Sequence, residues 1–152
     1  MANIRIKKKY ATLVDDCVGA VAPFKSMAQL ACFASMYAFN QSVKITSVKA
    51  TGGQEIRDAV LDDIEFKNQI GLLAIAHTKN PEILLDDEET KEKRFKIFED
   101  YTNAGLELIK DKKDKDVLDT NGLDTILSIL KDQTKSNLKL GEMTGKIEKP
   151  IF

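Results

Sequence analysis

Most of the chain consists of segments in which apolar residues recur every three to four positions, separated by short polar or glycine-containing segments. Apolar residues at this spacing fall on one face of an α-helix. The pattern predicts a mainly α protein, a single compact domain of about five to seven helices. The helices are expected over residues 8–19, 27–39, 54–63, 65–78, 86–110 and 121–136, with one helical turn over residues 81–85.

Several helix ends are marked by specific residues. Ser26 is followed three residues later by Gln29, the spacing of a capping box. Asn80-Pro81 ends the helix before it, because the residue before proline disfavours the α conformation. Asp86 or Asp87 is suited to cap the long helix that follows. These signals support the predicted helix boundaries.

The second helix, residues 27–39, is apolar on almost all of its faces, which predicts a central, buried position. We expect Leu30, Phe33, Ala34 and Tyr37 to be largely buried, against Leu73 and Phe98.

The long helix carries the most distinctive segment, residues 94–109, with three aromatic residues and Gly105 inside the helical pattern. A glycine there costs about 1 kcal/mol relative to alanine. Two explanations are open: a close approach of another helix at Gly105, or a kink that divides the helix.

Three segments do not fit a helix. In residues 1–7 Ile4 and Ile6 alternate with polar residues, which predicts a short extended arm. Residues 41–53 predict a loop or a minor extended segment that ends at Gly52-Gly53. Residues 137–152 predict an irregular C-terminal tail after a helical domain over residues 1–136.

Charge and composition exclude some classes of protein. The formal net charge is -1, from 23 basic and 24 acidic residues, so the chain as a whole is not a generic binder of polyanions. Its longest apolar runs are too short to span a bilayer, and the basic N-terminus lacks the apolar run of a signal peptide. We therefore expect a cytoplasmic protein without a membrane partner.

The residue types needed for catalysis or metal binding are sparse. His77 is the single histidine, and we expect it to be satisfied by a carbonyl or by water at a helix end. No zinc-binding or nucleophile motif is present, so we expect no catalytic residues, no metal and no cofactor. Cys17 and Cys32 lie in apolar helical patterns and are expected to be buried free thiols, although a disulfide between them stays open.

Two segments are candidate binding sites. The N-terminal arm has four positive charges that would contact a phosphate backbone, or would form a solvated terminus: Arg5, Lys7, Lys8 and Lys9. The tail has apolar residues among charges, as interaction sites do, and we expect it to pack on the domain or dock on a partner. Its apolar residues are Leu138, Leu140, Met143, Ile147, Ile151 and Phe152.

A family resemblance rests on residues 23–37 (PFKSMAQLACFASMY), 70–76 (IGLLAIA) and 97–109 (IFEDYTNAGLELI). In this order they resemble the DNA phosphorothioation (Dnd) system-associated protein 4 family, over roughly residues 20–130. The resemblance implies a prokaryotic, cytoplasmic protein of phage defence, and it transfers no catalytic residues. Membership in a sister defence system with similar small helical subunits is the alternative.

These observations predict a non-enzymatic accessory subunit that acts by protein–protein binding, with a larger ATPase or nuclease of the defence system as its partner. The alternative is a small DNA-binding module that uses the basic arm. An enzyme with a site near His77 is a third hypothesis. The sequence leaves the oligomeric state open.

Overall fold

The computed structural model describes residues 3–47 and 52–147, with side chains described up to residue 138. These residues form one mainly helical domain with six α-helices and a two-stranded sheet, which confirms the predicted fold class. The elements are β1 (Ile4–Ile6), the 3-10 helix η1 (Lys8–Tyr10), α1 (Ala11–Cys17), α2 (Met27–Asn40), β2 (Gln54–Ile56), α3 (Asp58–Leu61), α4 (Ile64–Thr78), the 3-10 helix η2 (Pro81–Leu84), α5 (Glu88–Asp114) and α6 (Leu123–Ile147).

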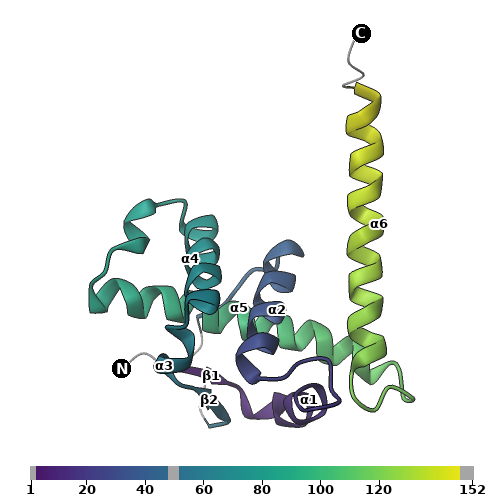
Figure 1. Ribbon diagram of the computed structural model, residues 1–152, viewed down its shortest axis with the longest axis horizontal. Coiled ribbons are helices and arrows are strands. Elements are labelled where there is room, and N and C mark those ends of the chain that lie inside the picture. The colour runs from purple at the N-terminus through teal and green to yellow at the C-terminus, as the bar shows by residue number, and fades with distance from the viewer. Residues whose placement is uncertain (1–2, 48–51, 148–152) are drawn as a thin grey trace.

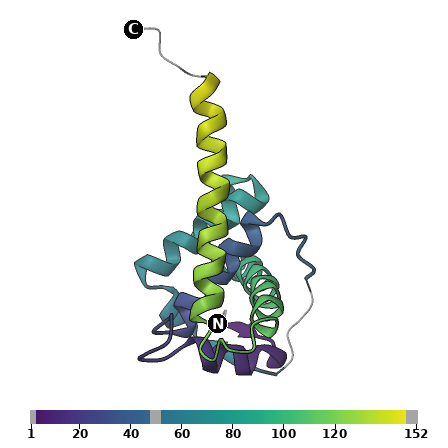
Figure 2. The same ribbon diagram turned by 90° about the vertical axis from the view of Figure 1, so that its right-hand side faces the viewer.

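The long helix α5 is the base on which the other elements are arranged. It runs across the molecule, and α2 and α4 stand against it (Figure 1). The sheet and α1 lie below α2, and α6 rises from the far end of α5 as a separate column. Figure 2, turned by 90°, shows that the outer, C-terminal part of α6 extends beyond the body of the domain.

The helices α2 and α5 pack very closely against each other. Ala31, Ala34 and Ala38 of α2 have no exposed surface on this seam. A Cβ atom at Gly105 would lie 1.8 Å from the carbonyl oxygen of Ala34, so only glycine allows this approach. The helix α5 is continuous through Gly105, which decides between the two explanations in favour of a close helix contact.

The segment at residues 54–56 differs from the sequence-based expectation. It is the strand β2, antiparallel to β1 with Ile4 opposite Ile56, and the predicted helix over 54–63 is reduced to α3. The partner strand lies about 50 residues away, so local periodicity could not indicate it. Gly53, at φ 85°, brings the chain so close to β1 that a Cβ atom would lie 2.0 Å from the carbonyl oxygen of Ile6.

The predicted helix caps are present. The backbone N–H of Gln29 donates to Ser26 Oγ at 3.2 Å, and the Gln29 side chain accepts from the N–H of Lys25 at 2.9 Å. The N–H of Thr90 donates to Asp87 Oδ1 at 2.8 Å, which identifies Asp87 as the cap of α5. Each cap satisfies a backbone donor that the first helical turn leaves unpaired.

The final helix is longer than predicted. It extends to Ile147, so the tail expected to be irregular from residue 137 is helical over residues 137–147. Its first turns are fixed to the body, where Ile126 and Ile129 are buried. Lys112 of α5 forms an ion pair with Asp132 at 2.8 Å. The boundary between domain and tail at residue 136 stays a prediction.

Asp119, in the loop before α6, is a buried carboxylate that fixes the start of this helix. Its Oδ2 accepts from the Thr125 backbone N–H at 2.9 Å and from the Thr125 hydroxyl at 2.5 Å. Burial alone would raise the pKa of Asp119, but the hydrogen bonds from Thr125 and from the Asp124 and Gly122 backbone lower it below the usual range. The ionised carboxylate therefore stabilises the folded chain.

We expect Asp119→Ala to reduce the free energy of unfolding at pH 7 by about 1 kcal/mol, as loss of a helix cap does. Because the folded pKa is lowered, this stabilisation is present above the unfolded pKa of about 3.9 and is lost as the pH falls through the folded pKa. Urea unfolding of both proteins at neutral and acidic pH tests this. A difference that grows on acidification would contradict the role of the ionised form.

Candidate partner-binding surfaces

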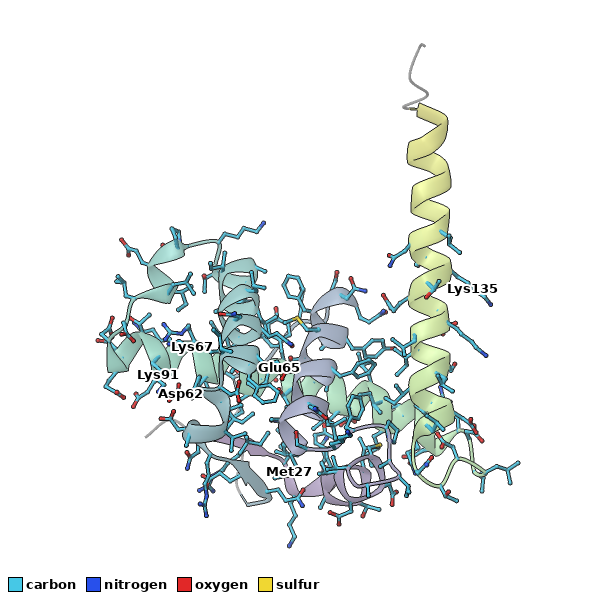
Figure 3. The ribbon with its side chains drawn as sticks, in the orientation of Figure 1. Met27, Asp62, Glu65, Lys67, Lys91 and Lys135 are labelled. Carbon is cyan, nitrogen blue, oxygen red and sulfur yellow. The ribbon has the colours of Figure 1, made fainter. Side chains whose placement is uncertain are left out.

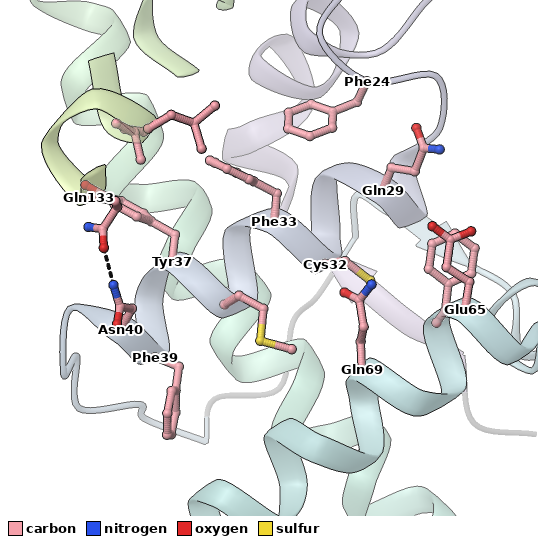
Figure 4. Close-up of a pocket in the computed structure, with 14 residues that line it drawn as sticks. Phe24, Gln29, Cys32, Phe33, Tyr37, Phe39, Asn40, Glu65, Gln69 and Gln133 are labelled. Carbon is pink, nitrogen blue, oxygen red and sulfur yellow. Dashed lines mark hydrogen bonds between the residues drawn. The ribbon is translucent and has the colours of Figure 1, made fainter. Parts of the chain in front are cut away.

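An open apolar groove lies between α2, α4 and α6, and we call it the α6 groove. Its volume is about 710 Å³. The face of α2 that carries Phe33 and Tyr37 forms the floor, Phe66 of α4 forms one wall and Leu130 of α6 forms the other. Figure 4 shows the amide of Asn40 on α2 donating to Gln133 on α6, the contact that closes one end.

The groove corrects one prediction about the core. Leu30 and Ala34 are fully buried, as expected, but Phe33 and Tyr37 are only half-buried because they face the groove. Their rings stack on each other with centroids 6.4 Å apart, and Phe24 packs on Phe33 at 5.4 Å. An open row of aromatic side chains of this kind is typical of protein interaction sites.

The two cysteines are free and buried, as predicted. Cys32 also lines the α6 groove. Burial, with a smaller contribution from the Glu65 carboxylate, raises the pKa of Cys32 to about 12. Burial raises the pKa of Cys17 to about 11. Because the thiolate is the nucleophilic form, both thiols are unreactive at neutral pH.

A second apolar surface lies on the other side of α4, where η2 packs against it; we call it the α4–η2 face. Leu72 is 66% exposed and Leu84 is 47% exposed. Together with Ile75 they line a hollow of about 490 Å³, whose cationic residues are Lys67 and Arg94. Figure 3 shows Lys67 on the η2 side of α4 and Glu65 on the side of α2.

Arg94 holds this face in position. It is 9% exposed, and its Nη1 donates to the carbonyl oxygens of Ile83 at 2.8 Å and Leu85 at 2.9 Å. These bonds fix η2 on α5. One sign of this surface is visible in the sequence, where Leu72 and Ile75 widen the apolar stripe of α4 beyond the width that one buried face requires.

The basic arm is part of the fold. Ile4 and Ile6 are buried in β1, while Arg5 and Lys9 form ion pairs with carboxylates. The Arg5 Nε lies 3.3 Å from Glu55, and the Lys9 Nζ lies 2.8 Å from Glu107. The backbone N–H of Lys7 donates to Asn103 at 2.9 Å, and Lys8 is exposed. The four cations therefore lie close together along the chain, and two of them, Arg5 and Lys9, are paired with carboxylates.

The predicted partner-binding residues of the tail are distributed along and beyond α6. Leu138 is 62% exposed. Leu140, Met143 and Ile147 lie in the helix, and their side chains are outside the described part, as are Ile151 and Phe152 altogether. Their role stays a prediction.

His77 has a structural partner that its sequence context did not reveal. Its Nδ1 lies 2.8 Å from the hydroxyl of Tyr101, and the two rings meet edge to face at 5.3 Å. Tyr101 is buried, and its burial raises the pKa of its hydroxyl. The Tyr101 ring also packs edge-on against Phe39 at 5.7 Å, so this cluster joins the ends of α2 and α4 to α5.

Two further kinds of site are absent from the part of the chain that the structure describes. No group of three or more His, Cys, Asp or Glu side chains is arranged to hold a metal ion within these residues. None of the helices in the described ranges is long and apolar enough to cross a membrane.

Comparison with known proteins agrees with the resemblance found in the sequence. Residues 3–145 match the family described as DNA sulphur modification system-associated protein 4. No curated protein and no solved structure shows significant similarity to the chain. The match covers β1 and almost all of α6. The chain therefore belongs to the DNA sulphur modification system-associated protein 4 family.

Proposed function

We propose that this protein is a non-enzymatic accessory subunit of the DNA sulphur modification system, linked to anti-phage defence, and that it acts by binding a larger protein of that system. The observation that supports the proposal most directly is the α4–η2 face. Leu72, Leu84 and Leu85 are all about half exposed or more on one side of the domain. Exposed apolar groups gathered around a hollow mark sites of protein interaction.

The chemistry of the face indicates the kind of segment that binds it. The apolar side chains of Leu72, Ile75 and Leu84 suit an aliphatic or aromatic anchor, and the hollow of about 490 Å³ gives it room. Lys67 and Arg94 contribute positive charge at the same hollow. The partner segment that complements this face carries an apolar anchor beside a carboxylate. An ATPase or nuclease of the system is the proposed carrier of that segment.

The pairing of the arm favours this function over the DNA-binding alternative. Phosphate contacts need cations that are not already neutralised, because affinity depends on the counterions that the cations displace. Arg5 and Lys9 are each within ion-pair distance of a carboxylate. These carboxylates reduce the positive electrostatic potential that the arm would present to DNA. DNA binding through Arg5, Lys7, Lys8 and Lys9 stays a prediction.

We expect Leu72→Glu to reduce capture of the partner by about tenfold or more, as loss of an interface anchor does. The test is co-expression of the tagged chain with the other proteins of its system, followed by pull-down. Because Leu72 is 66% exposed, the variant should fold normally, which thermal unfolding by circular dichroism checks.

A matched control is Val21→Glu, which puts the same charge at a residue 91% exposed in the loop between α1 and α2. It should leave capture unchanged. If the wild-type chain captures no protein of the system, the proposed function is wrong. If Leu72→Glu captures as much as Val21→Glu, the partner binds elsewhere.

A further inference from the structure

The outer part of α6 extends away from the body of the domain (Figure 2). Among the α6 side chains that the structure describes, up to residue 138, Gln133 is the last that bonds to the body, through Asn40, and residues 134–138 are all exposed. The helix continues to Ile147, so fourteen residues project, about 21 Å at 1.5 Å per residue. A helix of this length is marginal in water when nothing packs against it. A packing partner would therefore stabilise the projecting half.

The α6 groove follows α2 along most of its length. The α2 residues that line it run from Gln29 to Asn40, and the whole of α2 is fourteen residues long, about 21 Å. The groove is open along this floor, where Phe33 and Tyr37 are half-buried and Leu130 on the α6 wall is 46% exposed. A helix laid along α2 would contact all three and would complete a four-helix arrangement with α2, α4 and α6.

The charges of the two surfaces are opposite. Residues 134–147 contain Lys135, Lys139 and Lys146 against one acidic residue, Glu142, which gives this segment a net positive charge. The charged residue that lines the groove is Glu65, which is exposed. The whole chain has a net charge of -1, so long-range repulsion between two copies is small.

We propose that two copies of this chain form an antiparallel dimer in which the projecting half of each α6 lies in the α6 groove of the other copy. The arrangement is isologous, with the same two surfaces used by both copies. The antiparallel direction follows from the position of the body at the N-terminal end of α6. In a parallel pair the projecting halves would meet only each other, and both grooves would stay open.

The first test is the mass of the purified full chain by size-exclusion chromatography with light scattering. The expected result is a dimer, with twice the 17.0 kDa of one chain. If the wild-type chain stays monomeric up to a concentration of about 100 μM, its dimer dissociation constant lies above that value, which corresponds to a binding free energy weaker than about -5.5 kcal/mol. That result would overturn the proposal.

Two variants test the two sides of the contact separately. Leu138→Glu alters the projecting half, and Glu65→Lys reverses the charge of the groove; both residues are exposed, so the body should still fold. Each is expected to raise the dimer dissociation constant by about tenfold or more. Leu72→Glu, on the α4–η2 face, is the control and should leave the dimer intact.

The outcomes separate this proposal from others. A dimer that is weakened by Leu138→Glu but not by Glu65→Lys would mean that the α6 helices pair without the groove, and the proposal would be wrong. A dimer that is weakened only by Leu72→Glu would place the contact on the α4–η2 face. Because the dimer is measured without any other protein, its failure leaves the proposed accessory function standing.

Discussion

Replacing Gly105 by alanine is expected to destabilise the domain by about 3 kcal/mol, at the upper end of the usual cost of overpacking a core. The added Cβ atom would lie 1.8 Å from the carbonyl oxygen and 2.4 Å from the carbonyl carbon of Ala34. Both atoms belong to the α2 backbone, which has no rotamer to change. The helices α2 and α5 must therefore separate, and this opens the seam on which most of the core depends.

Gly71→Ala is the matched control, because Gly71 is also a buried glycine inside a helix. There the new Cβ would meet Leu84 Cδ2 at 3.2 Å, the end of a side chain that is 47% exposed and able to move. The gain in helix propensity, up to about 1 kcal/mol, then decides the result. We expect this variant to be as stable as the wild type or slightly more stable.

Chemical denaturation of the two variants beside the wild type measures both effects. Equal stability of Gly105→Ala and Gly71→Ala would show that the α2–α5 seam relaxes without cost. A loss confined to Gly105→Ala would show that the close approach of the two helices is required, and that a kink in α5 is not the reason for glycine at this position.

Most of the helices and their caps could be predicted from the sequence, because they depend on interactions between residues close together in the chain. Ser26, Gln29 and Asp87 act on backbone groups within four residues, and the capping spacing shows this directly. The strand pair of Ile4 with Ile56 was not readable as a pair, because it depends on two segments about 50 residues apart. Within β2, Ile56 is the single apolar residue, so this segment shows no alternation that would distinguish a strand from a helix.

The binding surfaces could be predicted from the sequence less well than the fold. The apolar pattern of α2 covers almost all faces, and it predicts burial for Phe33 and Ala34 alike. Only the tertiary arrangement shows that Ala34 meets α5 while Phe33 faces an open groove. In the same way, the pairing of His77 with Tyr101 depends on α4 lying beside α5, which no local spacing indicates.

A second large loss of stability is expected for a substitution in the core. Phe98→Ala is expected to cost about 3–5 kcal/mol, the range for a fully buried phenylalanine. The Phe98 side chain, at the middle of α5, has no exposed surface, so the cavity would be surrounded by packed residues. Since single domains have net stabilities of about 5–15 kcal/mol, this loss would remove a large part of the free energy of unfolding.

Phe33→Ala is the comparison, because it removes the same side chain from a half-buried position. Its ring loses contacts with Phe24 and Tyr37, and each aromatic pair contributes roughly 0.5–1.5 kcal/mol. The space it leaves is open to the groove, so solvent fills it and no closed cavity forms. We expect a loss of about 1–2 kcal/mol, clearly below that of Phe98→Ala.

Urea unfolding should be measured at low protein concentration, where a dimer would dissociate and Phe33 would be exposed to solvent in the wild type as well. Under that condition the two variants report on the monomer alone. Equal losses would mean that Phe33 is a core residue and that the groove is closed in solution. At high concentration the cost of Phe33→Ala should rise while that of Phe98→Ala stays constant, because only Phe33 lies on the surface that the second copy covers.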